Sequence, residues 1–61
     1  MSAYELTFEI FEEITGKTSI IKSETYLAVK DEIMSLAGCN YVTVKNSNGK
    51  VIDRFYVENL G

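Results

Sequence analysis

Hydrophobic and polar residues alternate in two stretches of the chain, one near each end. Such period-2 alternation predicts strands with one buried and one solvent-facing side. The first stretch, residues 4–12, places two sets of side chains on opposite faces: Tyr4, Leu6, Phe8 and Ile10 on one, and Glu5, Thr7, Glu9 and Phe11 on the other. A turn at Thr15-Gly16 and a second strand at Lys17–Lys22 complete a predicted hairpin. A loop of two or four residues puts Ile21 on the face of Ile10, whereas a three-residue loop puts Ile20 there.

The second alternating stretch predicts another hairpin, with strands at Tyr41–Lys45 and Val51–Glu58. Between them lies Asn46–Gly49, which ends in Asn-Gly, the strongest short hairpin signal. Loops of two and of four residues place the side chains on the same two faces of the sheet. The more apolar face carries Val42, Val44, Val51, Phe55 and Val57. The other face carries Tyr41, Thr43, Lys45, Ile52, Arg54 and Tyr56. Asp53 is the polar exception in the apolar set, and we expect it near a wet end of the sheet.

Between the hairpins, an amphipathic stretch from Ser23 to Ala37 predicts a helix. Ser23 is the expected N-cap, and Gly38 is the expected left-handed residue that ends the helix. Cys39 would then contact Met34 across that cap. One stripe of the helix is apolar and should face the sheet: Tyr26, Val29, Ile33, Leu36 and Ala37.

The predicted fold is a single α+β domain over residues 1–61, ordered ββαββ, with a four-stranded, mostly antiparallel sheet and one helix on one face. The first and last strands are the longest and most apolar, so we place them in the centre, side by side and parallel. The shorter second and third strands carry Lys17, Lys22 and Lys45, and lysines protect sheet edges from aggregation. In element order the chain resembles the β-grasp layout of small immunoglobulin-binding bacterial domains. That resemblance concerns topology and transfers no binding residue.

The composition and net charge exclude several classes of functional site. The chain has 61 residues, no histidine, one cysteine and a net charge of −3. These counts exclude zinc fingers, Cys-His nucleophile pairs and Ser-His triads, and the charge weighs against binding duplex DNA through its phosphates. No signal peptide or membrane-spanning apolar run is visible, so we expect a cytoplasmic protein that needs no cofactor and contacts no membrane.

A fragment of a phosphate-binding motif, Gly16-Lys17-Thr18, is better explained as a turn and the start of a strand. The full motif needs a glycine five residues before Gly16, where this chain has Phe11, and a helix directly afterwards.

The remaining candidates for chemistry are also weak. Neighbouring residues diverge on a strand or helix, so the acidic pairs Glu12-Glu13 and Asp31-Glu32 should be solvated surface charge rather than ligands or catalytic acids. No cationic neighbour in the sequence activates Cys39. We therefore expect no enzymatic activity.

The face of the sheet that the helix leaves open is the predicted binding site. Its predicted members are Phe11, Tyr41, Ile52, Arg54 and Tyr56, with Ile20 nearby. Contiguous exposed apolar patches mark interaction sites, and tyrosine and arginine are enriched in interface hot spots. The alternative is that cross-strand tyrosine pairs only stabilise a half-wet sheet. Leu27 and Met34, at the border of the helix stripe, either widen the core or protrude toward a partner.

These patterns favour a non-enzymatic protein-binding module, with a homodimer through the sheet face as a further expectation. Its small size and acidity are typical of inhibitors of host machinery encoded by phages or other mobile elements. The alternative function is binding of single-stranded nucleic acid by bases stacking on the open-face aromatics. Glutamates on the same face would repel phosphate, so nucleic acid is the less expected partner.

Overall fold

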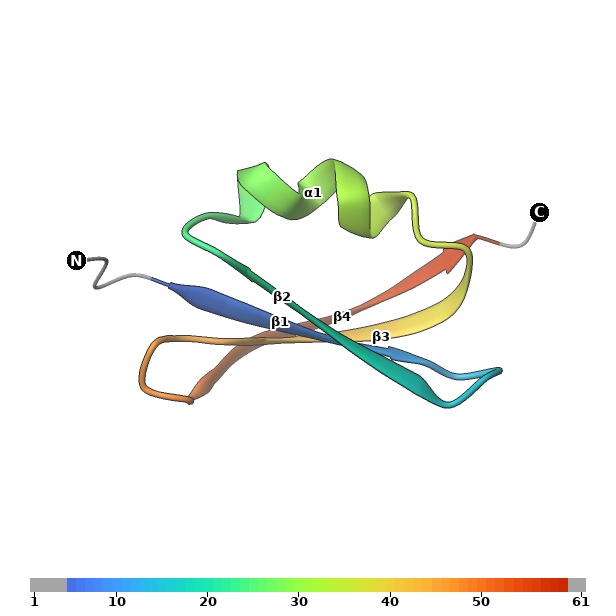
Figure 1. Cartoon of the computed structure of the whole chain (residues 1–61), viewed down its shortest axis with the longest axis horizontal. Coiled ribbons are helices and arrows are strands. Elements are labelled where there is room, and N and C mark those ends of the chain that lie inside the picture. Colours follow the sequence, from blue (N-terminus) through green and yellow to red (C-terminus); the bar gives the residue numbers. More distant parts are fainter. Residues whose placement is uncertain (1–4, 60–61) are drawn as a thin grey trace.

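The computed structural model describes residues 5–59 and confirms the ββαββ order (Figure 1). Four antiparallel strands form one open sheet, and the helix lies across one face of it. The elements are β1 (Leu6–Glu12), β2 (Lys17–Ser23), α1 (Tyr26–Met34), β3 (Gly38–Lys45) and β4 (Val51–Asn59). Tyr4, assigned above to the first strand, lies outside the described residues.

The predicted strand order is wrong. The sheet runs β2-β1-β3-β4, so β1 and β3 are central and β4 is an edge. The first and last strands are therefore neither adjacent nor parallel, and the β-grasp layout does not apply. Burial explains the order better than strand length, because Val42 and Val44 of β3 are almost fully buried whereas much of β4 is exposed. Of the lysines expected at edges, Lys17 and Lys22 lie on edge strand β2, but Lys45 lies on a central strand.

The first hairpin has a four-residue loop, since Glu12 pairs with Lys17. The loop ends at Gly16, whose φ of 73° is the left-handed conformation that glycine adopts without a steric penalty. This register places Ile21 opposite Phe8 and packs it against the core, while Ile20 is exposed on the other face.

The second hairpin turns around Asn46, whose side-chain oxygen accepts the backbone N–H groups of Asn48 and Lys50. Its strands pair as expected from Tyr41–Tyr56 to Val44–Asp53, and then the register shifts by one residue. This irregularity pairs Lys45 with Val51, where regular alternation would place Ile52. Val51 was predicted to face the helix, and it is instead exposed. Period-2 counting cannot foresee a bulge.

The helix is shorter than predicted at both ends. Thr25 is the N-cap in place of Ser23, and its hydroxyl oxygen accepts the Ala28 N–H at 3.2 Å. The helix ends at Met34. The side-chain amide of Asn59, at the end of β4, donates to the carbonyl oxygens of Met34 and Leu36, at 2.9 and 2.7 Å. The last carbonyls of the helix region are therefore bonded to the sheet, which stands in for a glycine cap.

Gly38 begins β3 and does not cap the helix. It has the predicted positive φ, 87°, but Cys39 after it is a strand residue paired with Glu58. The predicted cap contact between Cys39 and Met34 is therefore wrong.

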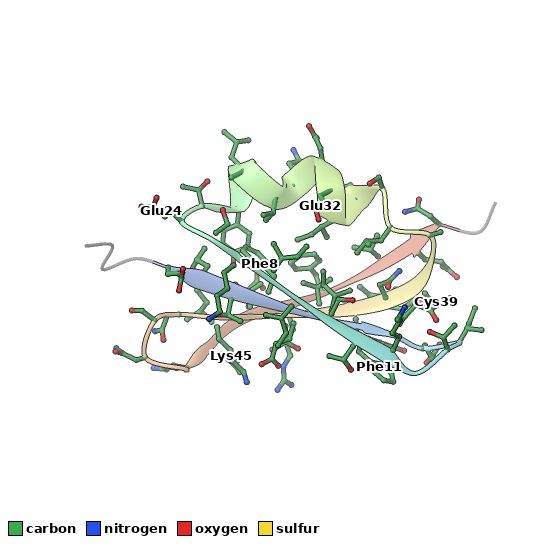
Figure 2. The ribbon with its side chains drawn as sticks, viewed as in Figure 1. Phe8, Phe11, Glu24, Glu32, Cys39 and Lys45 are labelled. Carbon is green, nitrogen blue, oxygen red and sulfur yellow. The ribbon has the colours of Figure 1, made fainter. Side chains whose placement is uncertain are left out.

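The core lies between the helix and the sheet, and Phe8 is at its centre (Figure 2). Tyr26 meets the Phe8 ring edge-on, with ring centroids 5.4 Å apart, and its hydroxyl donates to Asp53 at 3.3 Å. Asp53 is thus exposed and has a hydrogen-bond partner, as expected for the one polar residue in the apolar set of that strand. The buried apolar side chains are Phe8, Ile10, Val29, Ile33, Val42, Val44 and Val57.

Candidate functional site

The open face of the sheet carries the predicted binding residues, on strands β1, β3 and β4. Phe11 and Lys45 lie on the side away from the helix, whereas Phe8 points toward it (Figure 2). Each predicted member is exposed: Phe11, Tyr41, Ile52, Arg54 and Tyr56. Between 41% and 47% of the surface of each apolar member is accessible, so these side chains half pack on the sheet and leave area for a partner.

Three aromatic residues form a row across the face. Phe11 is opposite Tyr41, and Tyr41 is opposite Tyr56. The two tyrosine rings are tilted by 48° with centroids 4.8 Å apart, within the range of favourable aromatic pairs. We call Phe11, Tyr41 and Tyr56 the aromatic row. Arg54 is next to it along β4, whereas Ile52 lies further along, at the bulged end of that strand.

Acidic side chains and a thiol frame one end of the aromatic row. The Tyr41 hydroxyl donates to a carboxylate oxygen of Glu13 at 3.0 Å, and this bond, followed by the charge of Glu13, raises the pKa of Tyr41. A hydrogen bond with Cys39 raises the pKa of Tyr56, assisted by desolvation and by nearby negative charge including Glu58. Both hydroxyls therefore keep their protons to a higher pH than an ordinary tyrosine.

An ion pair links β1 to the end of β3 on this face. The Lys45 ammonium lies 2.8 Å from a carboxylate oxygen of Glu9, and about a third of each side chain is exposed. Partial exposure makes this pair worth only a modest stabilisation. The pair engages Lys45, and Arg54, opposite Thr43, lies beside the aromatic row.

Sequence reasoning placed Phe11, Tyr41, Arg54 and Tyr56 on one surface and expected glutamates of the first strand on the same face, but it missed Cys39. Cys39 was interpreted as a helix-cap residue, although it continues the same alternation as Tyr41 and Thr43. That alternation is the signal that could have extended the strand. Glu13 is two residues after Phe11, so continued alternation predicts that it lies on the same side as Phe11, and the fold of the hairpin loop brings it beside Tyr41.

A second apolar region lies between the helix and β4. This groove has a volume of about 230 Å³ and is lined by Tyr26, Lys30, Ile33, Met34 and Phe55. Leu27 is 80% exposed and Met34 56% exposed, so neither belongs to a widened core. Met34 lines the groove, and Leu27 protrudes into solvent.

The weaker candidates have structural roles. Lys17 and Thr18 begin β2 directly after the hairpin turn, so the fragment of a phosphate-binding motif is a turn and strand. Glu12 accepts the backbone N–H of Thr15 at 2.6 Å, the main reason why its pKa is lowered. Asp31 and Glu32 are exposed on the helix. Among residues 5–59, no group of three or more acidic, cysteine or histidine side chains is arranged to hold a metal ion.

Comparison with protein-family models, with curated proteins and with solved structures gives no match for this chain. Within the described residues, no helix is both long and apolar enough to cross a membrane.

Proposed function

We propose that this protein is a non-enzymatic protein-binding module whose contact surface is the open face of the sheet. The observation that carries the proposal is the aromatic row, three exposed rings aligned across β1, β3 and β4 with Arg54 beside them. Rings held by cross-strand packing offer contact area at little cost in conformational entropy, and arginine adds charge and planar hydrogen bonding.

The polar frame favours a protein as the partner over a nucleic acid. Glu9, Glu13 and Glu58 all contact groups of this face, and Lys45 is already paired. Phosphates would meet these carboxylates with one cation, Arg54, next to the aromatic row. A protein partner that presents basic or hydrogen-bonding groups around an apolar centre fits this pattern better.

The biological setting we propose is inhibition of host machinery by a small acidic protein encoded by a phage or other mobile element. This proposal rests on the size of the chain, its net charge of −3 and its lack of histidine-based chemistry. The inhibitor would act by covering a functional surface of its target.

The test is affinity capture from a bacterial lysate, with the folded double variant Tyr41→Ser/Tyr56→Ser as the matched control. A protein retained by the natural chain should be lost from the variant, because removal of two hot-spot rings weakens binding by at least about 2 kcal/mol. Circular dichroism should show the helix unchanged, because both side chains lie on the opposite face. Equal retention by the folded variant would contradict the proposal and shift attention to the groove lined by Met34 and Phe55.

Two further outcomes identify the other uses expected of this face. Binding of a single-stranded oligonucleotide that weakens steeply with salt and disappears in the double variant would establish the nucleic-acid alternative. Self-association lost in the double variant, but retained after substitutions on the outer edge of β4, would establish a homodimer through the face.

A further inference from the structure

The outer edge of β4 is a second surface suited to association. Within residues 5–59, no strand pairs with that edge. Unpaired N–H and C=O groups on an edge strand are a template for pairing with another strand. The opposite edge, β2, carries Lys17 and Lys22 and no acidic residue, so two β2 edges offer each other only like charges.

The regular part of β4 has a defined midpoint. The irregularity near Lys45 interrupts the start of the strand, and from Asp53 to Asn59 the pairing with β3 is continuous. When two copies of one strand pair antiparallel about a twofold axis, the central residue faces its own copy. If the whole stretch from Asp53 to Asn59 pairs with its copy, its central residue, Tyr56, lies on that axis.

This register is also the one that complements charge. With Tyr56 on the axis, Arg54 of each copy lies opposite Glu58 of the other, and opposite charges across strands are stabilising. An axis at Arg54 would put two arginines together, whereas axes at Phe55 or Val57 would pair Tyr56 with Arg54 or Glu58 and leave the charges unmatched. Only the midpoint register forms two ion pairs.

Apolar groups match in the same register on both faces. On the open face, Tyr56 meets its own copy, which joins the two aromatic rows into one. On the helix side, Phe55 lies opposite Val57 of the second copy, next to the apolar groove that Phe55 lines. Aromatic and branched side chains opposite one another are favourable cross-strand pairs.

The backbone at this edge is available for pairing. The Arg54 N–H donates to the side chain of its neighbour Asp53 at 2.8 Å, which identifies the outward direction of that amide. Because backbone groups alternate along a strand, the N–H groups of Tyr56 and Glu58 point the same way. In a paired edge, the Arg54 N–H would exchange the Asp53 carboxylate for a carbonyl of the second copy.

We propose that β4 pairs antiparallel with β4 of a second copy, centred on Tyr56 and fixed in register by two Arg54–Glu58 ion pairs. The two sheets then form one continuous sheet with both open faces on the same side. This inference shares Tyr56 and Arg54 with the proposed function but rests on the backbone edge of β4, so it is tested by self-association of the purified chain, with no partner present.

Charge reversal tests the register in solution. Sedimentation equilibrium should show a dimer that dissociates on dilution, and Arg54→Glu or Glu58→Arg should each raise the dissociation constant about tenfold by turning two attractions into repulsions. The double variant Arg54→Glu/Glu58→Arg should restore the dimer. Lys22→Glu, a charge reversal on the opposite edge, should leave the dimer unchanged. A folded double variant that fails to restore association would overturn the register.

Cross-linking tests the axis separately. In a Cys39→Ser background, Tyr56→Cys places each thiol opposite its copy, and the Cα separation of about 5.5 Å in a hydrogen-bonded pair lies within the range that a disulfide spans. Tyr56→Cys should therefore oxidise to a covalent dimer faster than Arg54→Cys, whose thiols lie apart. A natural chain that stays monomeric up to about 1 mM, with both cysteine variants oxidising at the same rate, would overturn the proposal.

Discussion

At the residue scale, Glu12 joins the first hairpin turn to the start of β3. One of its carboxylate oxygens accepts the Thr15 N–H, and the other accepts the Cys39 N–H at 3.4 Å. A β-carbon on Gly38 would lie 2.7 Å from that second oxygen, too close for a side chain to be accepted without movement of Glu12. Gly38 is therefore favoured chiefly by its φ of 87°, and a larger residue there would also displace the Glu12 carboxylate from the Cys39 N–H.

Stability should fall at alkaline pH in part through Tyr41. Its hydrogen bond to Glu13 and the charge of Glu13 raise the pKa of the phenol above 10.0, so the folded state holds this proton more tightly than the unfolded chain. The resulting stabilisation is complete below about pH 10 and is lost as pH rises through the raised pKa. Tyr41→Phe should therefore show a smaller alkaline loss of stability in urea unfolding. Glu13→Gln, which removes the charge but keeps an acceptor, should fall between the two, and identical losses in all three would contradict this role.

Asn40 is the reason why the predicted start of the third strand is wrong. It is 2% exposed, and its side-chain amide donates to the Ala37 carbonyl at 3.0 Å, so it is a buried polar residue with a partner. It occupies the inward-facing position that precedes Val42 and Val44. Asparagine favours turns, so the sequence predicted a strand that begins only at Tyr41. The partner of Asn40 is only three residues away, and such local bonds are typical of turns as well, so the sequence cannot distinguish this strand residue from a loop residue.

At the scale of elements, the helix is held by few groups. Its buried residues are Val29 and Ile33, its N-terminus is capped by Thr25, and Asn59 bonds the carbonyls at and just beyond its last turn. A helix of nine residues is too short to be stable alone in water, so packing and caps decide whether it forms.

The N-cap assignment makes a specific prediction. Thr25→Ala should destabilise the protein by about 1 kcal/mol, because it leaves the Ala28 N–H without its side-chain acceptor, whereas Thr25→Ser should retain stability. Ser23→Ala should cost less, since the Ser23 hydroxyl bonds only the backbone of Thr25, at 3.1 and 3.4 Å. Urea unfolding of the three variants measures the difference. A larger loss for Ser23→Ala would mean that Ser23 is the functional cap, as its sequence position suggested.

Both hairpins could be predicted, because each depends on local turn chemistry and alternation over neighbouring residues. The order of the strands could not. Two hairpins joined by one helix can dock with β3 or with β4 beside β1, and alternation is compatible with either. The choice follows from long-range packing, in which Phe8 is paired with Val44 and Ile10 with Val42. Neither pairing can be inferred from the residues that surround it in the sequence.

At the scale of the whole molecule, the division into a covered and an open face is the feature that the sequence predicted best. Alternation separated Phe8 from Phe11 on β1 and Val42 from Tyr41 on β3, and the structure keeps these divisions. Four of the five predicted site residues lie close together for that reason. Ile52 lies apart from the aromatic row because it is four residues from Tyr56 along β4, and the bulge near Lys45 removes it from regular pairing.

The same division supplies a matched pair of substitutions, since Phe8 and Phe11 are three residues apart on one strand and face opposite sides. Phe8 has no accessible surface, so Phe8→Ala should cost about 3–5 kcal/mol through lost burial and the cavity that remains. For a domain of this size that loss is close to the whole stability. Phe11 is 41% exposed, so Phe11→Ala should be tolerated, with a much smaller shift in the urea midpoint. If the aromatic row serves binding, Phe11→Ala should weaken partner capture while the domain stays folded. Equal destabilisation by the two substitutions would instead mean that the open face is held in place by its own packing and serves stability rather than recognition.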